Sequence, residues 1–223
     1  MNHLPIDDII SLLAAEYGTI ERHHRDPLSE LILTVLSQNT SDSNSRRAYD
    51  KLVHTFSSWE SVARADAGDI AGTIRTGGLS QVKALRIKEI LEQIRVRKGS
   101  YDLDFLSEMP LADARAWLQT LPGVGPKTAA CVLLFSLGKP VLPVDTHIYR
   151  VARRLGLIDS KVSVTKAHDV LGAMVPAEDI YQFHMRMVEH GRKICKARQP
   201  FCHQCVLLKL CPTGRTLLGI VSN

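Results

Sequence analysis

The stretch Leu121-Pro-Gly-Val-Gly-Pro-Lys-Thr-Ala129 decides the fold of this chain. Its Pro-Gly and Gly-Pro pairs break helices, and Gly123 and Gly125 permit a positive φ that other residues avoid. Pro126 suits the first position of a new helix, because its missing N–H would be unpaired there anyway. The stretch therefore predicts a tight turn between two helices. The N–H groups at the start of the second helix would then face outward, where they suit a phosphate oxygen.

Such a turn is typical of a helix-hairpin-helix unit that grips the DNA backbone, or of an ordinary corner between two helices. Elsewhere the apolar residues recur at helical spacing, and sustained period-two alternation is absent. Two clear stripes are Leu28, Leu31, Ile32, Val35 and Leu36, and then Leu85, Ile87, Ile90, Leu91 and Ile94. We expect the Lys and Arg residues of the second stripe's helix on its solvent face. The pattern predicts an all-α protein.

The composition excludes several classes of protein. The chain has 223 residues, 45% of them apolar and 23% charged, which is unlike a disordered or fibrous chain. Its longest apolar run, Ala129–Phe135, has seven residues, far fewer than the roughly 20 that a membrane helix needs. No basic lead-in precedes the first apolar stretch, so we expect no secretory signal and a cytoplasmic protein without a membrane partner.

The charge is unevenly distributed along the chain. There are 28 Lys and Arg residues against 23 Asp and Glu residues, a formal net charge of +5. Basic residues concentrate in residues 83–98 and 181–212. These clusters fit phosphate binding, and equally a solvated helix face.

Lys127 is a candidate catalytic residue because it falls in the first turn of the predicted second helix. The positive end of the helix dipole and partial burial both disfavour a charged ammonium there. An amine that loses its proton easily can attack a sugar C1′ and form a Schiff base. The alternative is a lysine that only contacts phosphate.

Asp145 is a second candidate, since it ends an extended segment just before the helix that contains Ile148, Val151, Ala152 and Leu155. Its common role at such a place is to cap the helix N-terminus. It could also stabilise positive charge on a sugar and help Lys127 lose its proton. One oxygen can cap while the other faces a pocket.

Four cysteines near the end of the chain predict a metal site. Cys195, Cys202, Cys205 and Cys211 are separated by six, two and five residues. In a protein expected to be cytoplasmic this density favours metal over disulfides. Zinc and a [4Fe–4S] cluster both accept four thiolates, so the spacing leaves the metal open. Cys131 lies in an apolar stretch, and we expect it to be a core residue.

The hairpin, the Val-Asp-Thr-His segment ending at His147 and the cysteine spacing resemble, in this order, the endonuclease III family of helix-hairpin-helix DNA glycosylases. The resemblance runs from about Leu28 to Cys211. It implies a six-helix barrel with the hairpin at residues 25–138, and a discontinuous helical domain of residues 1–24 and 139–223. It also implies that the four cysteines bind a [4Fe–4S] cluster, that Lys127 is the nucleophile and that Asp145 is the essential carboxylate.

The resemblance extends to DNA contacts. It implies that the hairpin residues Gly123, Val124 and Gly125 bind the DNA backbone, although Pro126 replaces the basic residue common in the family. Gly78-Leu79 resembles a wedge loop that enters the base stack, and its alternative is a plain connecting turn. In the segment Leu36-Ser-Gln-Asn-Thr-Ser-Asp42, either Gln38 or Asn39 would fill the gap left by the extruded base, or one of them would face the pocket and read the damaged base. The alternative is a polar helix end.

The function implied by the resemblance is that of a base-excision-repair DNA glycosylase with AP lyase activity, which cuts at abasic sites. The enzyme would act as a monomer on duplex DNA that contains a damaged pyrimidine or an abasic site, associated with the nucleoid if the host is bacterial. One alternative is a uracil or mismatched-thymine glycosylase with weak or no lyase activity. Another is a non-catalytic, metal-containing DNA-binding module, which would not need a carboxylate beside DNA.

Overall fold

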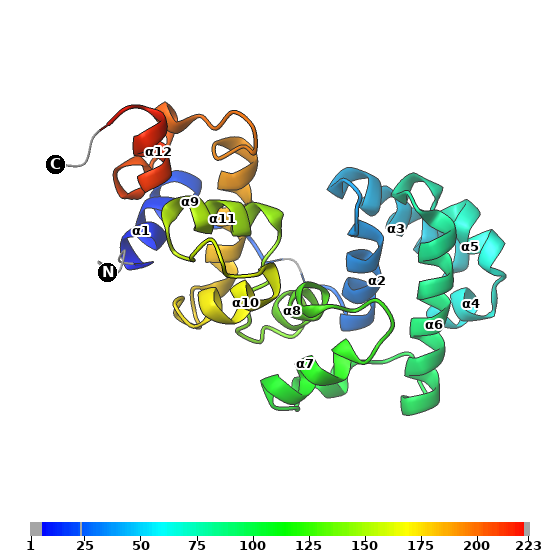
Figure 1. Ribbon diagram of the computed structural model, residues 1–223. Coiled ribbons are helices and arrows are strands. Elements are labelled where there is room, and N and C mark those ends of the chain that lie inside the picture. Colours follow the sequence, from blue (N-terminus) through cyan, green and yellow to red (C-terminus); the bar gives the residue numbers. More distant parts are fainter. Residues whose placement is uncertain (1–5, 23, 221–223) are drawn as a thin grey trace. The chain divides into compact units, whose positions relative to one another are not determined.

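All regular elements in the described part of the chain are helices. The structure is a computed structural model that describes residues 6–22 and 24–220 (Figure 1). The prediction of an all-α protein is therefore confirmed. Within these residues, no helix combines the length and the apolar character that crossing a membrane requires.

The chain forms two compact units. Residues 24–139 make up one of them. The described residues before 24 and after 139 make up the other, so this second unit is built from two separate parts of the chain.

The unit of residues 24–139 is a set of packed helices in which α2 contacts both α3 and α8, while α5 contacts α6. Its helices are α2 (Pro27–Ser37), α3 (Asp42–Phe56), α4 (Trp59–Arg64), α5 (Ala67–Thr73), η1 (Arg75–Gly77), α6 (Ser80–Lys98), η2 (Asp104–Ser107), α7 (Leu111–Gln119) and α8 (Pro126–Phe135). The predicted stripe of α2 is fully buried, and Cys131 lies in the core as expected.

The structure corrects two expectations about α6. Ile87, Ile90 and Ile94 are buried as the spacing predicts, but Leu85 is 55% exposed. Leu85 lies about 200° around the helix from Ile87, which places it on the solvent side. Conversely, the expectation that every basic residue of this helix faces solvent is wrong for Lys83, whose exposed fraction is only 4%.

The second unit is organised around α11, which packs against α1 and α9. Its helices are α1 (Ile6–Tyr17), α9 (Thr146–Leu155), α10 (Val164–Gly172), α11 (Ile180–Lys193), η3 (Cys202–Gln204), η4 (Leu208–Leu210) and α12 (Pro212–Leu217). Ile9 and Leu13 of α1 are fully buried. Polar bonds add to this packing, because the Tyr17 hydroxyl lies 2.9 Å from Nδ1 of His190 and Arg186 Nε donates to the carbonyl of Gly18 at 2.9 Å. The N-terminal segment is thereby fastened to α11.

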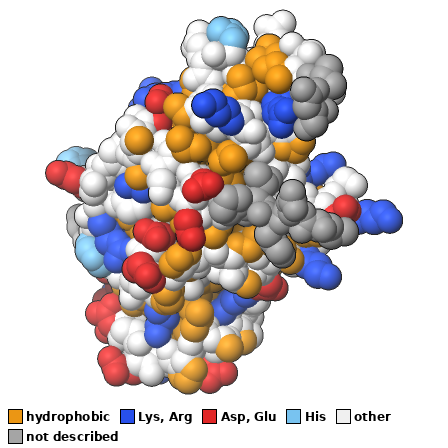
Figure 2. All heavy atoms as spheres, turned by 90° about the vertical axis from the view of Figure 1, so that its left-hand side faces the viewer, with side chains coloured by type: hydrophobic (Ala, Val, Ile, Leu, Met, Phe, Trp, Pro, Cys, Tyr) orange, Lys and Arg blue, Asp and Glu red, His pale blue; other side chains and the backbone are white. Residues whose placement is uncertain are grey.

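The face of the molecule on the side of α1 and α12 carries side chains of all kinds. Acidic, basic and apolar side chains are mixed there (Figure 2). Exposed apolar residues follow the last helix as well, among them Leu218 and Ile220. A surface that binds polyanions is enriched in positive charge, so this face does not have that signature.

Candidate functional site

The predicted turn between two helices is present between α7 and α8. Gly123 is exposed and has a φ of +71°, which other residues rarely adopt, and a Cβ built there would overlap the side chain of Arg86 from α6. Gly125 caps α8 in an extended conformation without a side-chain hydrogen bond, and Pro126 is the first residue of the helix. The Val124 side chain is buried, and its N–H donates to the carbonyl of Leu121 at 3.1 Å. The turn therefore offers exposed backbone at Gly123 and Gly125 to a ligand, with the Arg86 side chain of α6 lying against Gly123.

Lys127 is half-buried in the first turn of α8, and an acidic side chain from α2 lies within electrostatic reach of it. That group is Glu30, which is buried and pairs with Arg25 at 3.4 Å. Burial raises the pKa of Glu30, whereas the charges of Arg25 and Lys127 act in the opposite direction. The sequence analysis missed Glu30, although a single charged residue inside the apolar stretch 28–36 was a usable signal.

The segments around Gln38 and Leu79 belong to the same unit as the hairpin. The Gln38 side-chain amide donates to the carbonyl of Gly123 at 3.2 Å, while the neighbouring Asn39 is exposed and has a φ of +54°. Leu79 is 59% exposed, also with a positive φ of 49°. The structure thus ties Gln38 to the hairpin and leaves Asn39 and Leu79 facing solvent.

Asp145 caps α9 as its ordinary role predicts, because its Oδ1 accepts a hydrogen bond from the N–H of Ile148 at 2.8 Å. The extended segment before it is buried and held by two histidines that the sequence analysis did not single out. His184 Nδ1 lies 2.9 Å from the carbonyl oxygen of Pro143, and the N–H of Val144 donates to His168 Nδ1 at 3.2 Å. Asp145 and Lys127 belong to different units.

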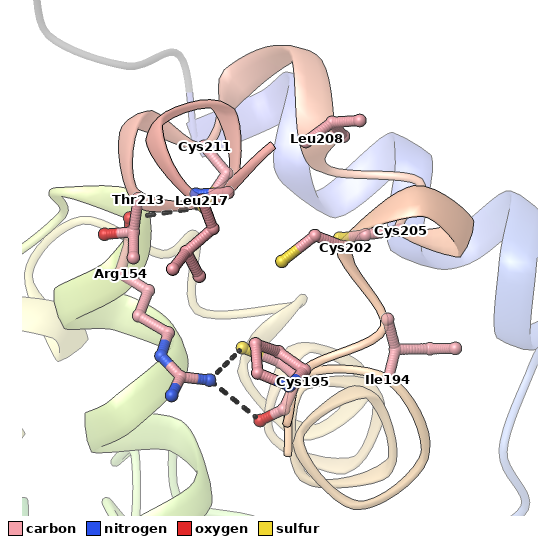
Figure 3. A pocket seen from close by; sticks show the side chains of 11 residues that line it. Arg154, Ile194, Cys195, Cys202, Cys205, Leu208, Cys211, Thr213 and Leu217 are labelled. Atoms are coloured by element: carbon pink, nitrogen blue, oxygen red, sulfur yellow. Dashed lines mark hydrogen bonds between the residues drawn. The ribbon is translucent and has the colours of Figure 1, made fainter. Parts of the chain in front are cut away.

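The four late cysteines line one pocket, in which about 310 Å³ is free of protein atoms, part of it open to solvent (Figure 3). None of the five cysteines, all within the described residues, forms a disulfide. Apolar side chains complete the lining, among them Ile194, Leu208 and Leu217. Within the described residues, no three His, Cys, Asp or Glu side chains are grouped as ligands of one metal ion. The cysteines therefore enclose a space, and do not converge on a point.

Three of these thiols are difficult to ionise without help. Burial raises the pKa of Cys205 to about 11, and neighbouring thiolates add to the effect. The pKa values of Cys202 and Cys211 are raised for the same two reasons, burial first. Four thiolates in this cavity would repel one another, so a cationic group that bound there would favour their ionised form.

Helix α9 joins Asp145 to the cysteine site. Two turns after the cap, Arg154 Nη1 donates to Cys195 Sγ at 3.3 Å (Figure 3). It also donates to the carbonyl of Lys196 at 2.7 Å. One turn earlier, Arg150 donates from Nε to the carbonyl of Cys195 at 2.9 Å. The residue after Cys195 is thus held by the same helix that begins at Asp145.

The chain is similar to DNA repair proteins along most of its length. Residues 32–174 match the family model described as HhH-GPD superfamily base excision DNA repair protein. An endonuclease III of Thermotoga maritima is 37% identical over 193 residues, 85% of each chain. A protein of Arabidopsis thaliana named as a DNA glycosylase is 36% identical over 175 residues, and this match spans 78% of the present chain but 59% of the plant protein.

The fold is similar to solved structures as well. The structure of a trapped covalent intermediate of endonuclease III with DNA, an estranged-adenine complex, matches with a TM-score of 0.82. The two sequences are 30% identical, and the match covers 98% of this chain and 99% of the other.

Replacing Gly123 by alanine should destabilise the protein by about 1–3 kcal/mol, because alanine is strained at this φ and its Cβ would displace Arg86. Gly125→Ala is the matched control, since φ is −91° there and no atom lies within 4 Å of the added Cβ. It should cost less than about 1 kcal/mol, the range of a cap substitution. Chemical denaturation of both variants measures the difference, and equal losses would contradict the close approach of Arg86.

Proposed function

This chain belongs to the HhH-GPD superfamily of base excision DNA repair proteins, and from that membership we infer that it works through Lys127 and Asp145. It is a DNA glycosylase with AP lyase activity. We propose damaged pyrimidines in duplex DNA as its substrates. The observation that carries the assignment of the nucleophile is the half-buried Lys127 at the start of α8, directly after the exposed turn of Gly123 and Gly125.

In the proposed reaction the neutral amine of Lys127 attacks C1′ of an extruded nucleotide. The base leaves with the electron pair of its bond to the sugar and takes up a proton, and the attached amine loses one. The sugar ring then opens: the C1′–O4′ bond breaks, O4′ takes up a proton, and a protonated Schiff base remains at C1′. This iminium makes the C2′ proton acidic. Its removal breaks the C3′–O bond and nicks the strand 3′ to the lesion, and water then releases the enzyme. Extrusion is required because C1′ and the bond to the base are hidden within the stack.

The role of Asp145 in the proposed reaction is electrostatic and comes from its negative charge. Its Oδ1 is used by the cap of α9, and the carboxylate still carries a full negative charge. That charge would stabilise the positive sugar as the base leaves.

DNA binding would use the exposed features of the unit of residues 24–139. The open turn at Gly123 suits a phosphate oxygen, and the exposed Leu79 suits insertion into the base stack. Asn39 is favoured to fill the gap that the extruded base leaves, because the Gln38 amide is already bonded to the hairpin.

The four cysteines would hold a [4Fe–4S] cluster. A cluster spreads four thiolate ligands over four iron atoms, which suits side chains that enclose a cavity and do not converge on one ion. The apolar lining and the N–H bond from Arg154 to Cys195 Sγ fit such a group as well. When bound, the cluster would neutralise the thiolates and fasten residues 195–211 to α9.

The uracil or mismatched-thymine alternative is less favoured, because relatives named endonuclease III match this chain closely and Lys127 supplies the amine that a lyase needs. A non-catalytic DNA-binding module is not favoured either, since the whole chain matches an enzyme that was trapped covalently on DNA.

Lys127→Ala should abolish the covalent adduct that borohydride traps between the enzyme and DNA with an abasic site, because no amine remains to form the Schiff base. Binding to the same DNA should stay measurable. Lys51→Ala is the control, since Lys51 is exposed on α3 of the same unit. Undiminished trapping by Lys127→Ala would refute the nucleophilic role.

Asp145→Asn and Asp145→Ala separate the two roles of this residue. Asparagine caps a helix as well as aspartate but has no charge, so Asp145→Asn should keep its melting temperature and lose about a hundredfold or more in turnover. Asp145→Ala should lose the turnover and in addition about 1 kcal/mol of stability. Near-normal turnover of Asp145→Asn would reduce the residue to a cap.

The purified protein should be yellow-brown and contain about four iron and four sulfide per chain. Cys202→Ser should lose both, because a ligand is removed. Cys131→Ala should keep both, because Cys131 is buried in α8 of the other unit and only packing is lost. A colourless wild-type protein with one zinc per chain would contradict the cluster.

A further inference from the structure

Lys83 is a buried lysine whose three protons all have acceptors. Its Nζ donates to the carbonyl of Leu36 at 2.6 Å, to the hydroxyl of Thr40 at 2.8 Å and to the carbonyl of Gly77 at 2.8 Å. Burying an ammonium is costly unless each N–H group finds an oxygen atom, and an ammonium has three to place. The surroundings of Lys83 therefore supply one acceptor for each N–H group of the ammonium. A lysine on a solvated helix face would bond to water and would not need these acceptors.

The acceptors come from two segments that are distant in the sequence. Leu36 lies in the last turn of α2, and Thr40 lies in the loop of residues 38–41, which contains Asn39 and is called the Asn39 loop below. Gly77 begins the turn of residues 77–79, called the Leu79 loop. The Thr40 hydroxyl also donates to the carbonyl of Gly77. One ammonium and one hydroxyl thus join the two loops directly.

Both loops contain strained backbone next to this network. Among the described residues, Asn39, Ser57 and Leu79 are the residues other than glycine with positive φ, and two of these three lie in the joined loops. Each such residue costs on the order of 1 kcal/mol and persists only where surrounding contacts fix it. Lys83 provides three of those contacts, at the ends of the strained segments.

The same side of α6 also reaches the hairpin. Arg86 lies three residues after Lys83, so the two side chains leave the helix on neighbouring positions of one face. The Arg86 side chain covers Gly123, and the Gln38 amide of the Asn39 loop donates to the Gly123 carbonyl. One face of α6 is therefore connected to the Asn39 loop, the Leu79 loop and the hairpin.

We propose that Lys83 is a positioning residue that fixes the Asn39 loop and the Leu79 loop in one register, so that both loops engage DNA at the same base pair. The inference rests on the proposed function, in which Leu79 enters the stack and Asn39 occupies the space of the extruded base. These two insertions must occur together, because each one alone leaves part of the stack open. A rigid link between the loops makes them a single unit, and Lys83 supplies it.

The test compares one reaction on two substrates. Cleavage of an abasic site in single-stranded DNA needs Lys127 but no opening of a base stack, whereas the same cleavage in a duplex needs both loops. Lys83→Met keeps an unbranched side chain that is one atom shorter, and it removes the ammonium. It should slow single-turnover cleavage of the duplex by about 10- to 100-fold, the range for misplaced groups. Cleavage of the single strand should stay within about threefold of the wild type.

Lys88→Met is the matched control on the same helix. Lys88 donates to the carbonyl of Ala63 at 2.9 Å and to that of Ala65, so it also binds backbone, but away from the two loops. Both substrates should be cleaved within about threefold of the wild-type rate. A duplex-specific loss shared by Lys88→Met, or a Lys83→Met loss of equal size on both substrates, would overturn the role of Lys83.

A second pair of variants covers the case in which Lys83→Met does not fold. Thr40→Val removes the hydroxyl bridge, and Thr40→Ser retains it. Thr40→Val should show the duplex-specific loss and Thr40→Ser should restore the rate, and an unaffected Thr40→Val would overturn the proposal. A wild-type protein inactive on both substrates, or an active Lys127→Ala variant, would refute the proposed function and this inference with it.

Discussion

The unpaired N–H groups at the start of an α-helix are the constraint on which this structure depends most. The first turn of every helix leaves such groups without partners inside the helix. At α9 the chain satisfies one of them with the carboxylate of Asp145, which fixes that carboxylate in space. At α8 it uses Gly125 and Pro126, which supply no side-chain acceptor and leave the turn open to a phosphate. The two helix starts therefore satisfy the same groups in different ways, and each carries one of the two residues proposed to act in catalysis.

The cysteine site has a mechanical relation to Asp145 that does not require the cluster to take part in base removal. Helix α9 begins at the Asp145 cap and ends against the cysteine loop, where Arg150 and Arg154 bind the backbone that follows α11. The loop itself has little regular structure, because η3 and η4 have three residues each. A bound cluster would replace the missing hydrogen-bonded structure with four covalent links. Loss of the cluster would then loosen the far end of the helix that orients the carboxylate.

The sequence predicted those features whose partners are close along the chain. Helical spacing identified the buried faces of α2 and α9, and the residue order before Ile148 predicted the Asp145 cap. The environment of Lys83 could not be predicted in this way, because two of its acceptors are backbone carbonyls, which carry no sequence signal. The same holds for His184, whose partner is the Pro143 carbonyl. The spacing of apolar residues identifies which side of a helix is buried, but it does not show that a lysine on that side has hydrogen-bond acceptors within reach.

A buried ammonium also explains why an apolar residue would not serve at position 83. The carbonyl of Leu36 belongs to the last turn of α2, where carbonyl groups lack partners within the helix, and that of Gly77 ends a turn. An apolar side chain would remove the Lys83 donor from the Leu36 oxygen and leave the Gly77 oxygen with the Thr40 hydroxyl alone, and a buried oxygen without a donor costs about 1–3 kcal/mol. Lysine satisfies them together and, because its three N–H bonds have fixed angles, it also fixes the distance between the two loops. The hydrogen bonds to the two carbonyls thereby offset the cost of removing the ammonium from water. The same bonds hold the two loops in the relative position that the proposed joint insertion into DNA requires.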